Sequence, residues 1–193
     1  MKLKLLVALL VASAFPRHDV IPPQANQYKA RLTREAHAAG GLGAPTALFA
    51  GQIHQESGYS LTAHSGVGAM GIAQFMPGSA AWIARVYPAQ LGGAAPLDPA
   101  WAIRALVYYD YWNYQRLSVF DEAQENRWAA SLAAYNGGLG WTQKDARIGA
   151  CKVWWGCADN VQDGRTQANL QQNRDYPQKI ILRWEPLYRA AGW

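Results

Sequence analysis

The chain has 193 residues, half of them apolar and only 16% charged. That length and composition predict one well-buried domain and leave too little chain for two of typical size. The formal net charge of +5 falls to about +3 if Lys2 and Lys4 belong to a leader, because 18 basic residues then become 16 against 13 acids. This mild positive bias suits an anionic polymer or surface, but without a Lys/Arg cluster it is no nucleic-acid footprint.

The first residues have the pattern of a secretory signal peptide. Met1 to Lys4 is basic, residues 5–12 are apolar, and Ala12-Ser13-Ala14 has the small side chains of a cleavage site. The apolar run is much shorter than the ~20 residues that span a bilayer, and no Cys follows it to carry a lipid. We therefore expect residues 1–14 to be a signal peptide, the protein to be periplasmic or secreted, and no stable membrane anchor.

Cys151 and Cys157 are the only cysteines in the chain. An even pair in an exported protein favours a small disulfide-closed loop, with two unpaired thiols as the alternative. No His lies beside them, so we expect no zinc site, and the sequence predicts no other metal or cofactor.

Helix start and stop signals, chiefly Pro, Gly and capping side chains, divide the rest of the chain. They predict helices over residues 26–39, from about Pro45, after Pro77, from Asp98-Pro99 to about Tyr114, over 127–136 with Asn126 as the cap, and over 173–189 with interruptions at Pro177 and Pro186. Residues 58–75 are rich in Gly, Ser and Thr, which predicts a loop with a small β-hairpin. The expected fold is mainly α, a single helical domain.

Glu56 closes an otherwise apolar segment. Phe49, Ile53 and Glu56 are spaced by four and three residues, so they share one face of the predicted helix. A carboxyl that faces an apolar core loses hydration, and the negative end of the helix dipole acts in the same direction, so its pKa rises. Glu56 could then stay protonated near neutral pH and act as a general acid. The alternative is a Glu that turns outward at a frayed helix end.

Two other stretches could form a groove beside Glu56. Residues 66–77 combine three glycines, which let a backbone approach a ligand closely, with Gln74 and Met76 as polar and apolar lining. Tyr135 and Asn136 end a helix before two glycines, where their polar groups could bind sugar hydroxyls or hold a carboxyl. The alternatives are a Gly-rich turn and an ordinary Gly helix cap.

Taken together, these stretches resemble the family 23 glycoside hydrolases, the soluble lytic transglycosylases related to goose-type lysozyme. The resemblance rests on Glu56-Ser57, on Gly68-Ala69-Met70-Gly71-Ile72-Ala73-Gln74-Phe75-Met76-Pro77, on Ala133-Ala134-Tyr135-Asn136-Gly137-Gly138, and on the helix start Asp98-Pro99. One departure is Gln172-Asn173-Arg174-Asp175-Tyr176, which stands where the family often has Glu-Thr-Arg-x-Tyr, so no role for that glutamate carries over.

The resemblance implies an α+β lysozyme-like fold, with a catalytic domain over residues 44–193, a leader and helix over 15–43, and a hairpin beside the groove. It implies that Glu56 is the catalytic acid and that its orientation comes from the Tyr135 hydroxyl. The implied substrate-binding residues are Ser57, Gln74, Met76, Tyr135 and Asn136. The implied partner is the peptidoglycan glycan strand, bound by a monomer.

The implied reaction uses a single acid. No Asp or Glu occurs between Ser57 and Leu97, where a two-carboxylate lysozyme would keep its second acid. The resemblance then implies cleavage of the MurNAc-GlcNAc β-1,4 bond with 1,6-anhydro-MurNAc ends. A goose-type muramidase that uses water and a catalytically silent glycan-binding domain are the alternatives. The sequence does not choose between a bacterial periplasmic wall-remodelling enzyme, a secretion-associated muramidase and a phage lysis protein.

Overall fold

The computed structural model describes residues 20–193, so the expected signal peptide lies outside the described residues. Most of the described chain is helical, which confirms the mainly α class. The α-helices are α1 (Lys29–Gly40), α2 (Thr46–Ser57), α3 (Pro77–Val86), α4 (Pro88–Leu91), α5 (Pro99–Arg116), α6 (Asn126–Gly137), α7 (Leu139–Gly149), α8 (Gln167–Lys179) and α9 (Glu185–Ala190). Shorter turns are η1 (Pro23–Tyr28), η2 (Ala123–Glu125), η3 (Ala158–Asn160) and the π-helical η4 (Ile180–Trp184). No helix within residues 20–193 is long and apolar enough to cross a membrane.

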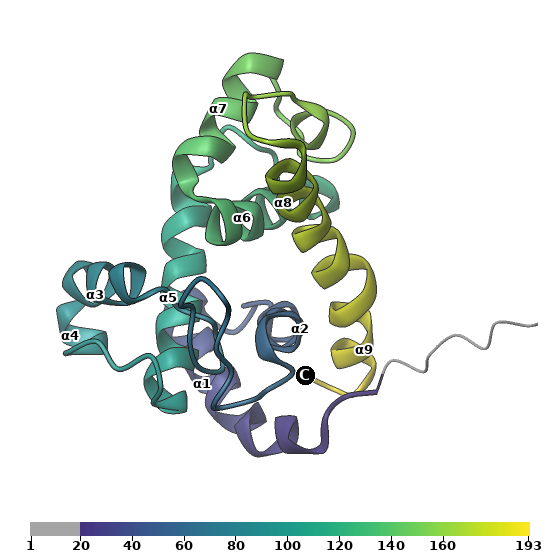
Figure 1. Ribbon diagram of the computed structural model, residues 1–193. Helices are drawn as coiled ribbons and strands as arrows, with labels where there is room; N and C mark the ends of the chain where they lie inside the picture. The colour runs from purple at the N-terminus through teal and green to yellow at the C-terminus, as the bar shows by residue number, and fades with distance from the viewer. Residues whose placement is uncertain (1–19) are drawn as a thin grey trace, which may run out of the picture.

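Helix α5 connects the two ends of the molecule, because it packs on α1 at one end and on α6 at the other (Figure 1). Helix α2 lies between α1 and the C-terminal segment formed by η4 and α9. Its side chains Leu48, Phe49 and Ile53 are fully buried in the hydrophobic core. Burial of such side chains stabilises a fold by roughly 1.5–3 kcal/mol each, so the core fixes the position of α2.

Residues 58–76 form a loop with very little β structure. The expected hairpin is reduced to two isolated antiparallel bridges, between His64 and Met70 and between Met70 and Phe75. The backbone turns through positive φ at Gly68 (93°) and Gly71 (73°), so neither side of the loop stays extended for the several residues that a strand needs. The loop is still fixed, because Phe75 is buried in the core.

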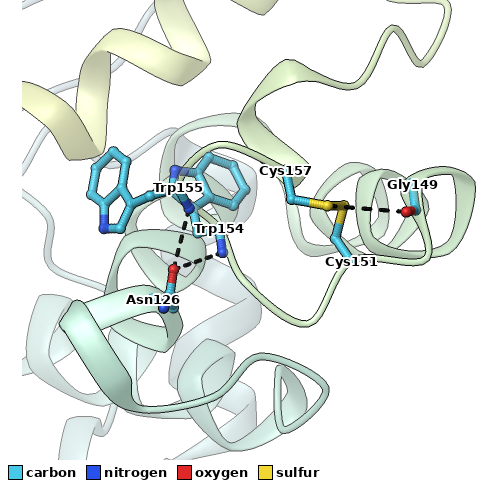
Figure 2. Close-up of a disulfide and its surroundings, with 6 residues drawn as sticks. All are labelled: Asn126, Gly149, Cys151, Trp154, Trp155 and Cys157. Atoms are coloured by element: carbon cyan, nitrogen blue, oxygen red, sulfur yellow. Dashed lines mark hydrogen bonds between the residues drawn. A yellow bond between two sulfur atoms is a disulfide. The ribbon is translucent and has the colours of Figure 1, made fainter.

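Asn126 anchors a loop rather than capping its helix. It is the first residue of α6, and its Oδ1 accepts hydrogen bonds from Trp154 N (2.8 Å) and Trp155 N (3.2 Å) (Figure 2). The predicted cap is therefore wrong, although the predicted helix agrees with α6 to one residue at each end. Cys151 and Cys157 form a disulfide in the same loop, with an S–S distance of 2.06 Å (Figure 2).

The C-terminal helical segment is longer and more continuous than expected. Helix α8 begins at Gln167, where the Thr166 side chain accepts a hydrogen bond from Asn169 N (3.3 Å), and Pro177 lies inside it. The helical path then continues through η4 into α9. Pro186 is the second residue of α9 and follows the π-helical η4 directly. Helix α7 was not expected at all.

Candidate active site

Glu56 lies in the last turn of α2, at the end of the helix face that carries Phe49 and Ile53. Gly58, in the left-handed conformation (φ 58°), ends the helix directly after it. The side chain is partly buried, and it lines a pocket of about 270 Å³. The structure thus places the carboxyl where the apolar core meets the surface, as the spacing of the three residues predicts.

Burial raises the pKa of Glu56 from 4.5 to about 8. The Tyr176 hydroxyl, from α8, donates a hydrogen bond to Glu56 Oε1, and this contact opposes the rise because it favours the ionised form. Desolvation outweighs the hydrogen bond. Glu56 is therefore mostly protonated at pH 7, yet it has a donor in place to stabilise its carboxylate.

Four other expected residues lie around the same pocket: Gln74, Met76, Tyr135 and Asn136. The Gln74 side chain is held by hydrogen bonds from Nε2 to Ala63 O (3.1 Å) and Gly71 O (2.9 Å). These bonds use the amide nitrogen and leave the amide oxygen as the free acceptor of this side chain. The Met76 side chain is 41% exposed and contributes an apolar wall.

Two expected residues make contacts that differ from those predicted. Ser57 does not line the pocket, and its hydroxyl donates to Ile72 O (2.7 Å), which ties the end of α2 to the glycine-rich loop. The Tyr135 hydroxyl donates to Ala73 O (2.8 Å). The hydroxyl that donates to Glu56 is that of Tyr176, which the sequence analysis did not single out.

Sequence reasoning missed Tyr176, although a signal was present. Gln172 and Tyr176 are four residues apart and therefore share a face of α8, and Gln172 also lines the pocket that contains Glu56. The stretch from Gln172 to Tyr176 lacks the family's frequent glutamate but keeps its tyrosine. Its tyrosine is the residue that the structure brings to Glu56.

A second carboxyl lies in the core near Glu56. Asp110 on α5 is fully buried, and desolvation and the nearby Glu56 charge both raise its pKa well above the usual range. Gln52, one turn before Glu56 on α2, makes a polar contact that works against this rise. The contact falls short of a complete hydrogen bond, since the side-chain atoms of Gln52, Asp110 and Asn113 are buried without well-formed partners. Because Asp110 is fully buried and does not line the pocket, it has no access to a ligand there.

Among the described residues that line this pocket, Glu56 is the only acid. Residues 20–193 also contain no group of three His, Cys, Asp or Glu side chains that could hold a metal ion. The chemistry that this arrangement offers is proton transfer by one carboxyl in a cleft lined with amides, hydroxyls and apolar side chains.

Comparison with solved structures finds similar folds in much larger enzymes. An inactive mutant of the lytic transglycosylase Slt from Pseudomonas aeruginosa matches with 25% identity and a TM-score of 0.60, over 86% of this chain and 24% of that one. The 70 kDa soluble lytic transglycosylase from Escherichia coli matches with 22% identity and a TM-score of 0.63, over 84% and 24%. A complex of the 70 kDa soluble lytic transglycosylase with bulgecin A matches with 23% identity and a TM-score of 0.59. This chain thus corresponds to about a quarter of each larger protein.

The family comparison covers the central part of the chain. The profile described as "Transglycosylase SLT domain" matches residues 35–150, which include α2, the glycine-rich loop and α6. Since the match extends over more than half of the chain, the protein belongs to the transglycosylase SLT domain family.

Proposed function

We propose that the protein is a peptidoglycan lytic transglycosylase in which Glu56 is the single acid and base. The observation that carries the proposal is that Glu56 is the only acid among the described residues that line its pocket. Burial there raises its pKa to about 8, which suits a proton donor. Glycosidases that use water place a second carboxylate within about 5–10 Å, across the scissile bond. Asp110 cannot take that role because it is fully buried.

The reaction follows from one carboxyl that gives and regains a proton. Glu56 donates its proton to the oxygen of the MurNAc-GlcNAc β-1,4 bond, and the C1–O bond of MurNAc breaks. The N-acetyl carbonyl of the same sugar supports the positive charge that develops at C1. The Glu56 carboxylate, stabilised by the Tyr176 hydroxyl, then takes the proton of the MurNAc O6 hydroxyl while O6 bonds to C1. The product is a 1,6-anhydro end, and no water is consumed.

The groove residues have separate tasks in this proposal. The Gln74 amide oxygen and the Asn136 amide bind sugar hydroxyl or acetamido groups, and Met76 packs against an apolar sugar face. Tyr135 supports the glycine-rich loop through Ala73. Ser57 acts on the same loop from α2.

Digestion of purified murein followed by mass spectrometry tests the proposal. Anhydro-muropeptides, lighter by one water than hydrolysis products, are the expected result. Reducing ends would identify a muramidase instead, and the absence of released fragments would identify a glycan-binding domain. Glu56→Gln, which keeps an acceptor oxygen for Tyr176, is expected to lose at least a hundredfold in kcat. Full activity of that variant would disprove the assignment.

We also propose that the protein acts as a monomer outside the cytoplasm, exported by residues 1–14. Determining the N-terminus of the exported protein by mass spectrometry tests the cleavage. Sedimentation of the exported protein tests the monomer.

A further inference from the structure

A second pocket continues from the candidate active site. It has a volume of about 450 Å³, within the range of pockets that bind small ligands, about 300–1,000 Å³. Two of its residues, Asn136 and Gln172, also line the pocket of Glu56, so the two hollows share a wall. Residues from α6, the start of α7, the loop before α8 and α8 itself line it: Asn136, Gly137, Trp141, Gly164, Arg165, Thr166, Asn169, Gln172 and Asn173.

Trp141, near the start of α7, is the aromatic surface of this second pocket, and 38% of it is exposed. Lys144 Nζ lies 4.7 Å and the Arg165 guanidinium carbon 5.3 Å from the indole centroid. Both cations are themselves fixed by Asp163, since Lys144 Nζ donates to its carbonyl (2.6 Å) and Arg165 forms an ion pair with its carboxylate (2.7 Å). The indole is therefore held in place before any ligand binds, which lowers the entropy cost of binding.

The second pocket carries no free charge. Among its described lining residues Arg165 is the only ionisable one, and its guanidinium is neutralised by Asp145 (2.9 Å) and Asp163. The exposed polar residues of the lining are Thr166, Asn169 and Gln172, whose hydroxyl and amide groups can bind hydroxyl and acetamido groups but offer no counter-ion. An exposed indole beside neutral amides suits the apolar face and polar edge of an uncharged sugar ring.

We propose that this second pocket is a further sugar-binding subsite, in which Trp141 stacks on a neutral N-acetylated amino sugar of the same glycan strand that Glu56 cleaves. The lactyl carboxylate of a muramic residue would find no unpaired cation among the residues that line this pocket, since Lys144 is not one of them, so the expected occupant is N-acetylglucosamine. The inference rests on the proposed function, because it names where the strand runs beyond the cleavage site. Its consequence is that strands long enough to reach Trp141 are better substrates than short ones.

Cleavage and binding of peptide-free glycan strands of two lengths, a tetrasaccharide and an octasaccharide, test the subsite. Trp141→Ala is expected to lower the octasaccharide-to-tetrasaccharide ratio of kcat/KM about tenfold, mainly through KM, which is the range of one aromatic contact. Trp141→Phe keeps a stacking ring and is expected to retain most of the ratio. Leu182→Ala removes an apolar side chain that is 63% exposed and lines neither pocket, and it serves as the control.

Binding separates this inference from the proposed function. In the Glu56→Gln background, titration calorimetry is expected to show that Trp141→Ala weakens octasaccharide binding about tenfold. A length ratio and an affinity that do not change in Trp141→Ala, or a fall of equal size in Leu182→Ala, would overturn the subsite. If the wild type binds the octasaccharide through Trp141 but cleaves nothing, the subsite stands and the lytic function fails.

Discussion

Replacing Glu56 by Gln is expected to stabilise the protein at neutral pH, although it removes the proposed catalytic group. Burial raises the pKa of Glu56 from 4.5 to about 8, so at pH 7 the folded protein holds a proton that the unfolded chain has released. A group of this kind contributes stability that is fully present below pH 4.5 and is lost as the pH rises towards 8. Gln carries no charge at any of these pH values, so the Glu56→Gln variant does not lose this stability as the pH rises.

The size of the effect follows from the width of that pH window. Each pH unit corresponds to about 1.4 kcal/mol of unfolding free energy. Between pH 4.5 and pH 7 the upper bound is about 3 kcal/mol, and the partial solvent contact of Glu56 reduces the expected gain to roughly 1–3 kcal/mol.

Urea unfolding between pH 4 and pH 8 measures this gain. The difference in unfolding free energy between Glu56→Gln and the wild type is expected to be close to zero at pH 4 and to grow with pH. Glu122→Gln makes the same chemical change on a side chain that is 66% exposed, and it is the matched control. A Glu56→Gln difference that stays constant across this range would refute the reasoning.

Two further substitutions test the surroundings of Glu56. Tyr176→Phe removes the hydroxyl that favours the ionised form of Glu56. The alkaline limb of the pH–rate profile is therefore expected to move up by about one pH unit while kcat falls. Tyr135→Phe, whose hydroxyl contacts a backbone carbonyl, should leave that limb in place, and an equal shift in both variants would contradict the assignment. Gly71→Ala adds a Cβ 2.2 Å from a backbone carbonyl oxygen at a residue with φ 73°. Thermal unfolding is therefore expected to show a loss of at least about 2 kcal/mol in the free energy of unfolding. Gly68→Ala, with φ 93° and open space around the added atom, should lose less stability, and equal losses would exclude the close contact as the cause.

The parts of the site that sequence reasoning found are those set by local structure. The spacing of Phe49, Ile53 and Glu56 fixes which way the carboxyl faces once a helix forms, and the structure confirms that face. The start of α5 was equally predictable, because Asp98 Oδ1 accepts the hydrogen bond from Ala100 N (2.8 Å) that an N-cap makes. Neither feature depends on distant parts of the chain.

The parts that could not be predicted depend on contacts between distant segments. Tyr176 reaches Glu56 across 120 residues, and this contact needs the register of α8 against α2. Asn126 carries the right side chain for a cap, yet its amide oxygen serves Trp154 and Trp155, which lie in a loop about thirty residues later. In both cases tertiary contacts decide which of several possible partners a polar side chain takes.

The relation between Glu56 and Asp110 explains how one carboxyl can serve both halves of the proposed reaction. Two carboxylates in a shared low-dielectric region cannot both ionise easily, and ionised Glu56 raises the pKa of Asp110 further. When Glu56 gives up its proton, Asp110 therefore stays neutral, and the Tyr176 hydroxyl stabilises the single negative charge. Gln172 stands where the family often has a glutamate, and it contributes an uncharged amide to the pocket. The negative charge thus forms and is neutralised on the Glu56 carboxylate alone, as the proposed reaction with a single acid and base requires.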